Sequence, residues 1–184
     1  VQTDGEAAAE LLQQAATHYD EAKTAADALA RTLTGRSQER PEAAQKAASD
    51  ALKQVFNPSL YEFRKGVAQQ TLAQLRTQEV NSLSQLARLK QYTTDVLKGA
   101  GLEVPKELAS ADYAAQLKQA TKEATEAFTA ADEAFKNVIG APLASDGQKA
   151  SARIAQIVNE YAWMKLLEGT AGPDSAPVKE RRKS

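Results

Sequence analysis

The side chains that could carry chemistry in this sequence are few and widely spaced. His18 is the only histidine and the chain has no cysteine, which excludes a zinc site built on a histidine pair, thiolate ligands and a cysteine nucleophile. The sequence has no glycine-rich phosphate loop and no Gly-x-Ser-x-Gly elbow, and no serine has a histidine base in a recognisable pattern. We therefore predict no catalytic residue, no metal site, no cofactor and no enzymatic activity.

The histidine and two aspartates lie beside a repeated apolar stripe. Asp27 and Asp132 each end a Thr-Ala-Ala-Asp segment, and His18 directly precedes Tyr19, a residue of the stripe. None of the three has a companion set of ligands near it in the sequence. We expect both aspartates to be solvated acids on helix faces, and His18 to be a semi-exposed structural residue.

The best candidate for a contact patch lies near the end of the last apolar segment. It consists of Trp163, Met164, Leu166 and Leu167. The alternative is that these side chains fill the core at the end of a helix, and this is the interpretation that we favour.

The charge of the chain argues against one class of partner. The net charge is −1, and the basic end at 179–183 contributes +3, so residues 1–178 carry −4. A net negative charge on these residues argues against binding to nucleic acid. The basic end could contact phosphate or a membrane surface, but short exposed basic ends are usually only solvated.

The spacing of apolar residues predicts helices along the whole chain. Alanine, the best helix former, occurs 37 times, against 9 glycines, 6 prolines and 5 % aromatic residues. A stripe over 8–33 advances by 4 and 3 residues alternately, and a second stripe over 113–138 repeats it 105 residues later. Residues 12–35 and 117–140 share 10 identities in 24 pairs. Seams of alanine predict straight helices at close spacing.

Five helices follow from these stripes and from their expected caps. Asp4 is expected to cap the first helix, Ser59 and Glu62 to form a capping box before the third, and Ser110 to begin the fourth. A disordered basic tail or stalk is expected over 169–184. The predicted helices cover 6–34, 41–56, 60–98, 111–139 and 148–168.

The last predicted helix is the most apolar. Ile154, Ile157, Tyr161 and Met164 follow one another at spacings of 3 and 4, and Val158 widens the stripe. We therefore expect this helix to pack on two neighbours.

Together these features predict an all-α fold, an elongated antiparallel helical bundle of about five helices with Ala-rich heptad seams. Residues 1–168 form one extended bundle. The hairpins 6–56 and 111–168 are either duplicated copies around the long helix 60–98, or alike through composition alone. Each alanine buries little area, so many turns in parallel must supply the stability.

An alanine-rich, cysteine-free helical bundle followed by a segment with proline and serine resembles the surface coat proteins of insect-stage trypanosomes, namely the glutamic acid/alanine-rich protein family. The resemblance covers 6–168 and includes the two Thr-Ala-Ala-Asp segments, but the 15 glutamates are fewer than is typical. It implies a glycoprotein coat on the extracellular face of the cell, held in the membrane by a glycosylphosphatidylinositol (GPI) lipid anchor whose signal is missing from this chain. Such a coat would shield the membrane and contact host or vector surface molecules. No functional residue follows from it.

Two other functions fit the same sequence, with a secreted or periplasmic location as the alternative. Amphipathic helices rich in glutamine could open and lay their apolar faces on lipid, as in apolipophorin-type bundles, although the long helix 60–98 argues against this. A bacterial helical adaptor or binding protein is the other alternative. Vesicle clearance would indicate the first function, and recovery of one stoichiometric partner would indicate the second.

Overall fold

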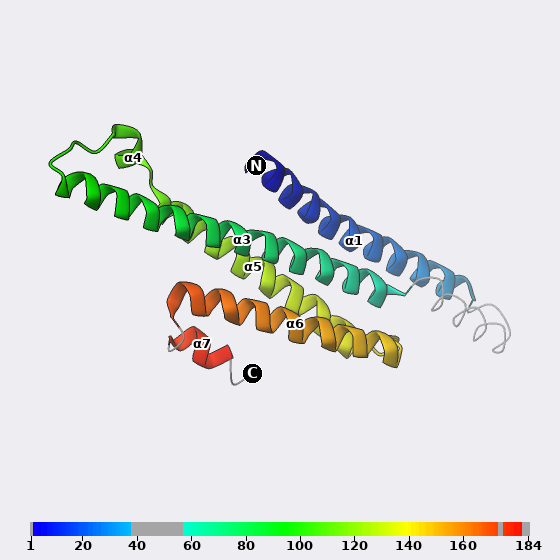
Figure 1. The fold of residues 1–184 in the computed structure, drawn as a ribbon. Coiled ribbons are helices and arrows are strands. Elements are labelled where there is room, and N and C mark those ends of the chain that lie inside the picture. Colours follow the sequence, from blue (N-terminus) through cyan, green and yellow to red (C-terminus); the bar gives the residue numbers. More distant parts are fainter. Residues whose placement is uncertain (1, 38–56, 173–174, 182–184) are drawn as a thin grey trace.

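The fold is all-α, as the sequence predicts. The computed structural model describes residues 2–37, 57–172 and 175–181 of the chain, and these residues contain helices and no strands. Figure 1 shows the helices in order. They are α1 (Gln2–Ser37), α3 (Pro58–Gly99), α4 (Lys106–Ser110), α5 (Tyr113–Gly140), α6 (Asp146–Ala171) and α7 (Ala176–Arg181).

Helix α3 is the spine of the molecule. Its 42 residues span about 63 Å at about 1.5 Å per residue. Helices α1 and α5 both pack against it, α6 packs on α5 and touches α3, and the short α7 packs on α6. The last turns of α3, together with α4, project beyond the other helices (Figure 1). The bundle is therefore elongated, and none of the long helices that the structure describes packs along this end of the spine.

The Ala-rich stripe of α5 forms the centre of the core. Its first two members, Tyr113 and Leu117, are half-buried. The other six are 0 % to 4 % exposed, and they are Ala120, Ala124, Ala127, Ala131, Ala134 and Val138. Because alanine has a short side chain, α3 and α6 can both approach the backbone of α5 closely. The prediction of a seam on this face is confirmed.

The equivalent stripe of α1 is only partly buried. Ala15 and Ala22 are half-buried, Ala26 is buried, and Leu29 is 42 % exposed. The most buried positions include Ala9 and Ala16, beside the predicted stripe. Helix α1 therefore turns the predicted face toward α3, slightly rotated, and packs less deeply than α5 does.

Two aromatic pairs fill the space that alanine leaves. Phe128 of α5 and Trp163 of α6 stack with ring centroids 6.0 Å apart and planes 9° apart. Phe63 of α3 and Phe135 of α5 are tilted at 54° with centroids 5.9 Å apart. Both phenylalanines of α5 are 0 % exposed, so each ring closes one layer of the bundle.

The predicted helix starts are wrong in three places. The N-cap of α3 is Asn57, whose side chain accepts a hydrogen bond from the Ser59 backbone N–H, so the predicted capping box of Ser59 does not form. Asp4 lies inside α1 rather than before it. Ser110 ends α4, and Asp112 caps α5 instead by accepting from the Ala115 N–H at 3.0 Å. At α3 and α5 an Asx side chain displaced the expected cap, whereas α1 begins before Asp4.

The end of α3 and the start of α6 have clear local causes. Gly101, at φ +72°, adopts the left-handed conformation that favours glycine, and the N–H of Leu102 reaches the carbonyl of Leu97 at 2.9 Å. This is the Schellman arrangement that ends many helices. Ser145 and Gln148 form a reciprocal capping box at the start of α6.

The described residues of 169–184 are mostly helical, whereas a disordered tail or stalk is predicted there. Helix α6 continues through Ala171, and α7 follows with Val178 at 0 % exposed. Helix α7 packs on α6, and the Val178 side chain is buried in this arrangement. The predicted helix 41–56 lies outside the described residues, so the duplication of 6–56 and 111–168 stays a prediction.

Candidate interaction surfaces

The residues that could have formed a catalytic or metal site lie apart. His18 is exposed on α1 and its Nδ1 is 3.0 Å from Glu21, a neighbour one turn away. Within the described ranges, no group of three or more histidine, aspartate or glutamate residues could hold a metal ion. His18 thus has an ordinary helix-surface environment, more exposed than expected.

Asp132 corrects one expectation of the sequence. It was expected to be solvated, but it is only 5 % exposed. Its carboxylate accepts a hydrogen bond from the Gln156 amide at 2.8 Å and pairs with Lys136 at 2.7 Å. Asp132 therefore links α5 to α6, whereas Asp27, at the equivalent position, is half-buried on α1. The shared segment does not predict this difference, because Thr-Ala-Ala precedes both aspartates.

The predicted contact patch lies largely in the core. Trp163 and Leu166 are 7 % and 3 % exposed, while Met164 and Leu167 are half-buried. Trp163 stacks on Phe128, and Leu167 packs against the same cluster. As the favoured alternative proposed, Trp163 and Leu166 are core residues, so they are not available as a contact patch.

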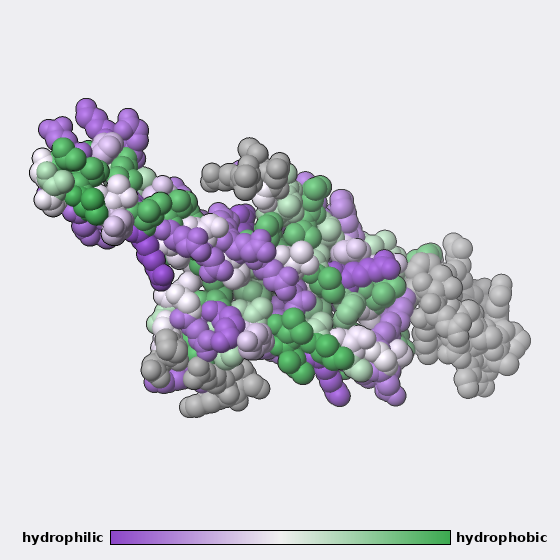
Figure 2. Space-filling model, viewed as in Figure 1, coloured by the Kyte–Doolittle hydropathy of each residue, from purple (hydrophilic) through white to green (hydrophobic). Residues whose placement is uncertain are grey.

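The exposed apolar face of α6 is a different one. Ile154, Ile157, Val158 and Tyr161 are 65 %, 68 %, 47 % and 58 % exposed. The sequence predicted that this stripe would pack, yet α6 turns the opposite face inward, the one that carries Ala152, Asn159 and Trp163. Figure 2 shows hydrophobic residues gathered over the middle of α6. Two apolar stripes compete on this helix, and periodicity alone could not say which one meets α5.

A second exposed apolar surface lies on the projecting end of α3. Leu86, Leu89, Tyr92 and Val96 follow at spacings of 3, 3 and 4 and are 43 % to 69 % exposed. Leu102, just beyond the helix, is 59 % exposed. Figure 2 shows hydrophobic residues at this end of the molecule as well. We call these five residues the distal surface.

The distal surface stands on an ordered support. The ammonium group of Lys90 donates hydrogen bonds to the carbonyls of Ala109 and Ala111, at 3.1 and 2.6 Å. These contacts tie the segment that contains α4 back to α3. The apolar side chains of the distal surface therefore belong to a braced helix end.

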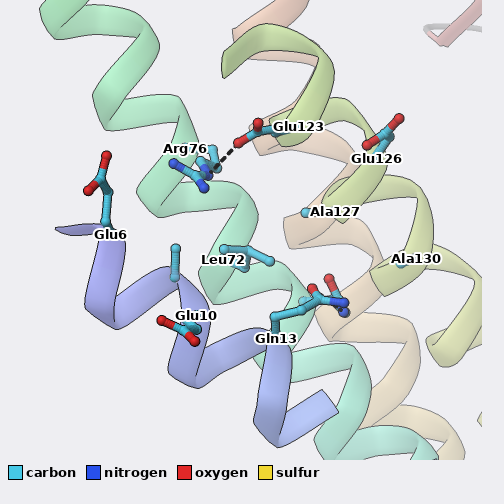
Figure 3. A pocket seen from close by; sticks show the side chains of 11 residues that line it. Glu6, Glu10, Gln13, Leu72, Arg76, Glu123, Glu126, Ala127 and Ala130 are labelled. Carbon is cyan, nitrogen blue, oxygen red and sulfur yellow. Dashed lines mark hydrogen bonds and ion pairs between the residues drawn. The ribbon is translucent and has the colours of Figure 1, made fainter. Parts of the chain in front are cut away.

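A groove runs between α1 and α5, with α3 as its floor (Figure 3). It encloses about 540 Å³. Leu72, Ala9 and Ala127 supply apolar surface, and Gln69 closes the floor through a hydrogen bond to Gln13 at 3.4 Å. Carboxylates line both rims, contributed by Glu6, Glu10, Glu123 and Glu126.

The guanidinium group of Arg76 occupies part of this groove. Arg76 pairs through Nη1 with Glu79 of its own helix at 2.7 Å and through Nε with Glu123 at 3.0 Å, and the second pair joins α3 to α5. The groove is lined by four glutamates, two glutamines, one arginine and apolar residues, and by no histidine, serine or lysine. It has the character of a structural groove between helices.

No family model, curated protein or solved structure matches this chain. Of the helices that the structure describes, none has both the length and the apolar character needed to cross a membrane.

Proposed function

We propose that this protein is a non-enzymatic helical binding protein that uses a braced rod to present the distal surface to a protein partner. Of the functions compatible with the sequence, this is the adaptor alternative. The observation that carries it is the distal surface itself, in which four large apolar side chains of α3 lie 43 % to 69 % exposed. Contiguous exposed apolar surface of this kind marks interaction sites in soluble proteins.

The composition of the distal surface also supports a protein partner. Tyr92, at 69 % exposed, is its most exposed member, and tyrosine is enriched where binding energy concentrates. Leu89 and Val96 flank it on the same side of α3. A partner helix could lay its own apolar face along this row, as in other helix-pairing interactions.

The test is a photo-crosslinking experiment with the whole protein. A benzophenone amino acid at position 92 should crosslink one protein from extracts of the source cells in stoichiometric yield. The matched control places the same probe at Gln116, an exposed position of α5 outside the distal surface. Equal crosslinking at both positions, or no partner at either, would overturn the proposal.

The lipid-binding alternative is an outcome of a companion measurement. Vesicles of phosphatidylcholine with phosphatidylglycerol are mixed with the wild-type protein and with Tyr92→Gln, then floated on a density gradient. We expect no flotation of either protein. Flotation of the wild type that Tyr92→Gln abolishes would assign the distal surface to lipid instead.

The coat function implied by the family resemblance is a second proposal. The elongated α3 spine supports it, because a rod holds one surface away from its point of attachment. The precursor sequence tests it. A signal peptide together with a small-residue site and a hydrophobic tail would support the lipid anchor, and a precursor without them would remove it.

A further inference from the structure

We infer that the outer face of α6 is a dimer interface, and that its occupant is α6 of a second copy of this chain, running antiparallel. This inference goes beyond the proposed binding function, because it concerns a separate surface and a different partner. It is motivated by Ile154, Ile157, Val158 and Tyr161, which are 47 % to 68 % exposed on one side of a rigid, capped helix.

The positions of these side chains fit a helix pair. In heptad terms Ile154 and Tyr161 occupy position a, and Ala150, Ile157 and Met164 occupy position d. Ala150, Ile154, Ile157 and Tyr161 are exposed, and Met164 is half-buried. An a/d stripe of this kind is the seam along which two helices pack.

The antiparallel orientation follows from the sizes of the side chains. When the two helices run in opposite directions, each a position faces a d position of the second copy. Ile154 then meets Ile157 at the centre, and this contact occurs twice because a two-fold interface repeats every pair. Tyr161 meets Ala150 on either side, so that the largest side chain faces the smallest.

A parallel pair would fit less well. Tyr161 would face Tyr161 and Ala150 would face Ala150, which crowds one end of the seam and leaves space at the other. The antiparallel pair also sets the helix dipoles in opposite directions. The side-chain sizes and the helix dipoles therefore both favour the antiparallel pair.

The charges at the edge of the seam agree with this orientation. Arg153 and Glu160 lie seven residues apart on the same edge, at position g, so each Arg153 would come opposite Glu160 of the second copy. Glu160 already has an interaction within its own chain. Ion pairs at an exposed edge contribute little affinity, so this pair affects orientation more than strength.

The size of the surface indicates a weak dimer. Stable interfaces bury about 800 Å² per partner. The four exposed apolar side chains supply part of that area, and the seam from Gly147 to Met164 extends it over about 26 Å at about 1.5 Å per residue. We therefore expect a dissociation constant in the micromolar range rather than an obligate dimer.

Sedimentation of the whole protein over a concentration series tests the association. The wild type should shift from monomer to dimer, and Ile157→Glu should stay monomeric because the charge lies in both central contacts. Leu11→Glu is the control, since Leu11 is 64 % exposed on α1, far from the seam, and this variant should dimerise as the wild type does. Circular dichroism of each variant establishes that it is folded.

Cysteine crosslinking tests the orientation of the two helices. The chain has no native cysteine, so a disulfide can form only between introduced cysteines. A mixture of Ala150→Cys and Tyr161→Cys proteins should form a disulfide-linked heterodimer under mild oxidation. Neither variant should crosslink efficiently alone, because like positions meet only in a parallel pair. Preferential crosslinking of each variant with itself would overturn the antiparallel arrangement.

Two results would overturn the interface altogether. One is a wild type that remains monomeric up to about 1 mM. The other is a dimer that Ile157→Glu leaves intact. Neither result bears on the distal surface of α3, so the photo-crosslinking test at position 92 remains independent.

Discussion

Gly66 lies in the middle of α3 although glycine is the weakest helix former apart from proline. The reason is the neighbouring ring of Phe135, because a Cβ atom at position 66 would lie 2.6 Å from the Phe135 Cε1. Phe135 is 0 % exposed and has no space to retreat. Glycine here is required for the close approach of α3 to α5.

Gly66→Ala should therefore destabilise the protein despite the better helix propensity of alanine. The overpacking cost exceeds the propensity gain, and we expect the free energy of unfolding to fall by about 1–2 kcal/mol. Urea denaturation measures it. Gly169→Ala is the control, since a Cβ at this position of α6 meets nothing within 4 Å, and it should raise the free energy of unfolding by up to about 1 kcal/mol. A more stable Gly66→Ala protein would contradict the account of the contact.

Asn159 is the most deeply buried polar residue of the α5–α6 contact, at 0 % exposed. Its amide donates a hydrogen bond to the Phe128 carbonyl at 2.9 Å, while its Oδ1 has no hydrogen-bond partner among the described residues. The environment therefore requires a donor at this position and gives nothing to an acceptor.

Asn159→Asp should be strongly destabilising although the two side chains have almost the same shape. The aspartate would lose the donor and place a carboxylate oxygen against the Phe128 carbonyl, so we expect a loss of about 3 kcal/mol or more in the free energy of unfolding at pH 7. Asn137→Asp, at an exposed position of α5, should change it by less than about 0.5 kcal/mol. Thermal denaturation followed by circular dichroism compares the two. Similar stabilities for both variants would show that position 159 is not sealed from water.

The individual helices differ in how they use alanine. In α5 the buried alanines form an unbroken seam between α3 and α6, and Ala124 and Ala131 are 0 % exposed. In α1 the main contact is with α3, and of the equivalent residues Ala26 is buried whereas Ala15 and Ala22 stay half-buried. The same sequence pattern thus yields a core helix in one place and a covering helix in the other.

Ala131→Leu should force α5 away from its neighbours. Inserting three carbon atoms into a filled seam costs about 1–3 kcal/mol in the free energy of unfolding. Ala114→Leu, on the exposed side of the same helix, should change it by less than about 0.5 kcal/mol. Urea denaturation of both variants measures the difference. An Ala131→Leu variant as stable as the wild type would mean that the seam holds unfilled space.

Three mutually packed helices form the centre of the molecule, and α1 is the fourth long helix beside them. Helices α3, α5 and α6 contact one another, whereas α1 is joined to α3 by Ala9, Ala16, Ala26 and by the ion pairs Lys23–Glu62 and Asp20–Lys65. Few large apolar side chains of α1 are buried, so its local stability should be the lowest of the long helices.

Hydrogen exchange should reveal this order. Backbone amides of α5 are expected to exchange most slowly, at the rate set by global unfolding, and those of α1 to exchange at least about tenfold faster, which corresponds to about 1.4 kcal/mol. Mass spectrometry of peptides from 2–29 and 117–138 makes the comparison. Equal protection of α1 and α5 would indicate that the four helices unfold as one unit.

Composition and periodicity were enough to predict the fold class, the four long described helices to within a few residues, and the buried seam of α5. These are local properties, because alanine propensity and a 3.6-residue period act within one helix. Two of the wrong helix starts are also local, because Asn57 and Ser59, and Ser110 and Asp112, are competing capping residues within a few positions.

The tertiary structure determines which faces of the helices are exposed. Helix α6 carries an apolar stripe on each side, and the face with Trp163 packs against Phe128, so Ile154 and Ile157 face outward. Likewise Asp27 and Asp132 both end a Thr-Ala-Ala-Asp segment, but Asp132 is buried against α6 whereas Asp27 is half-buried. A repeating pattern predicts which residues share one face of a helix. Whether that face is buried depends on which other helices pack against it, and this is determined by the whole chain.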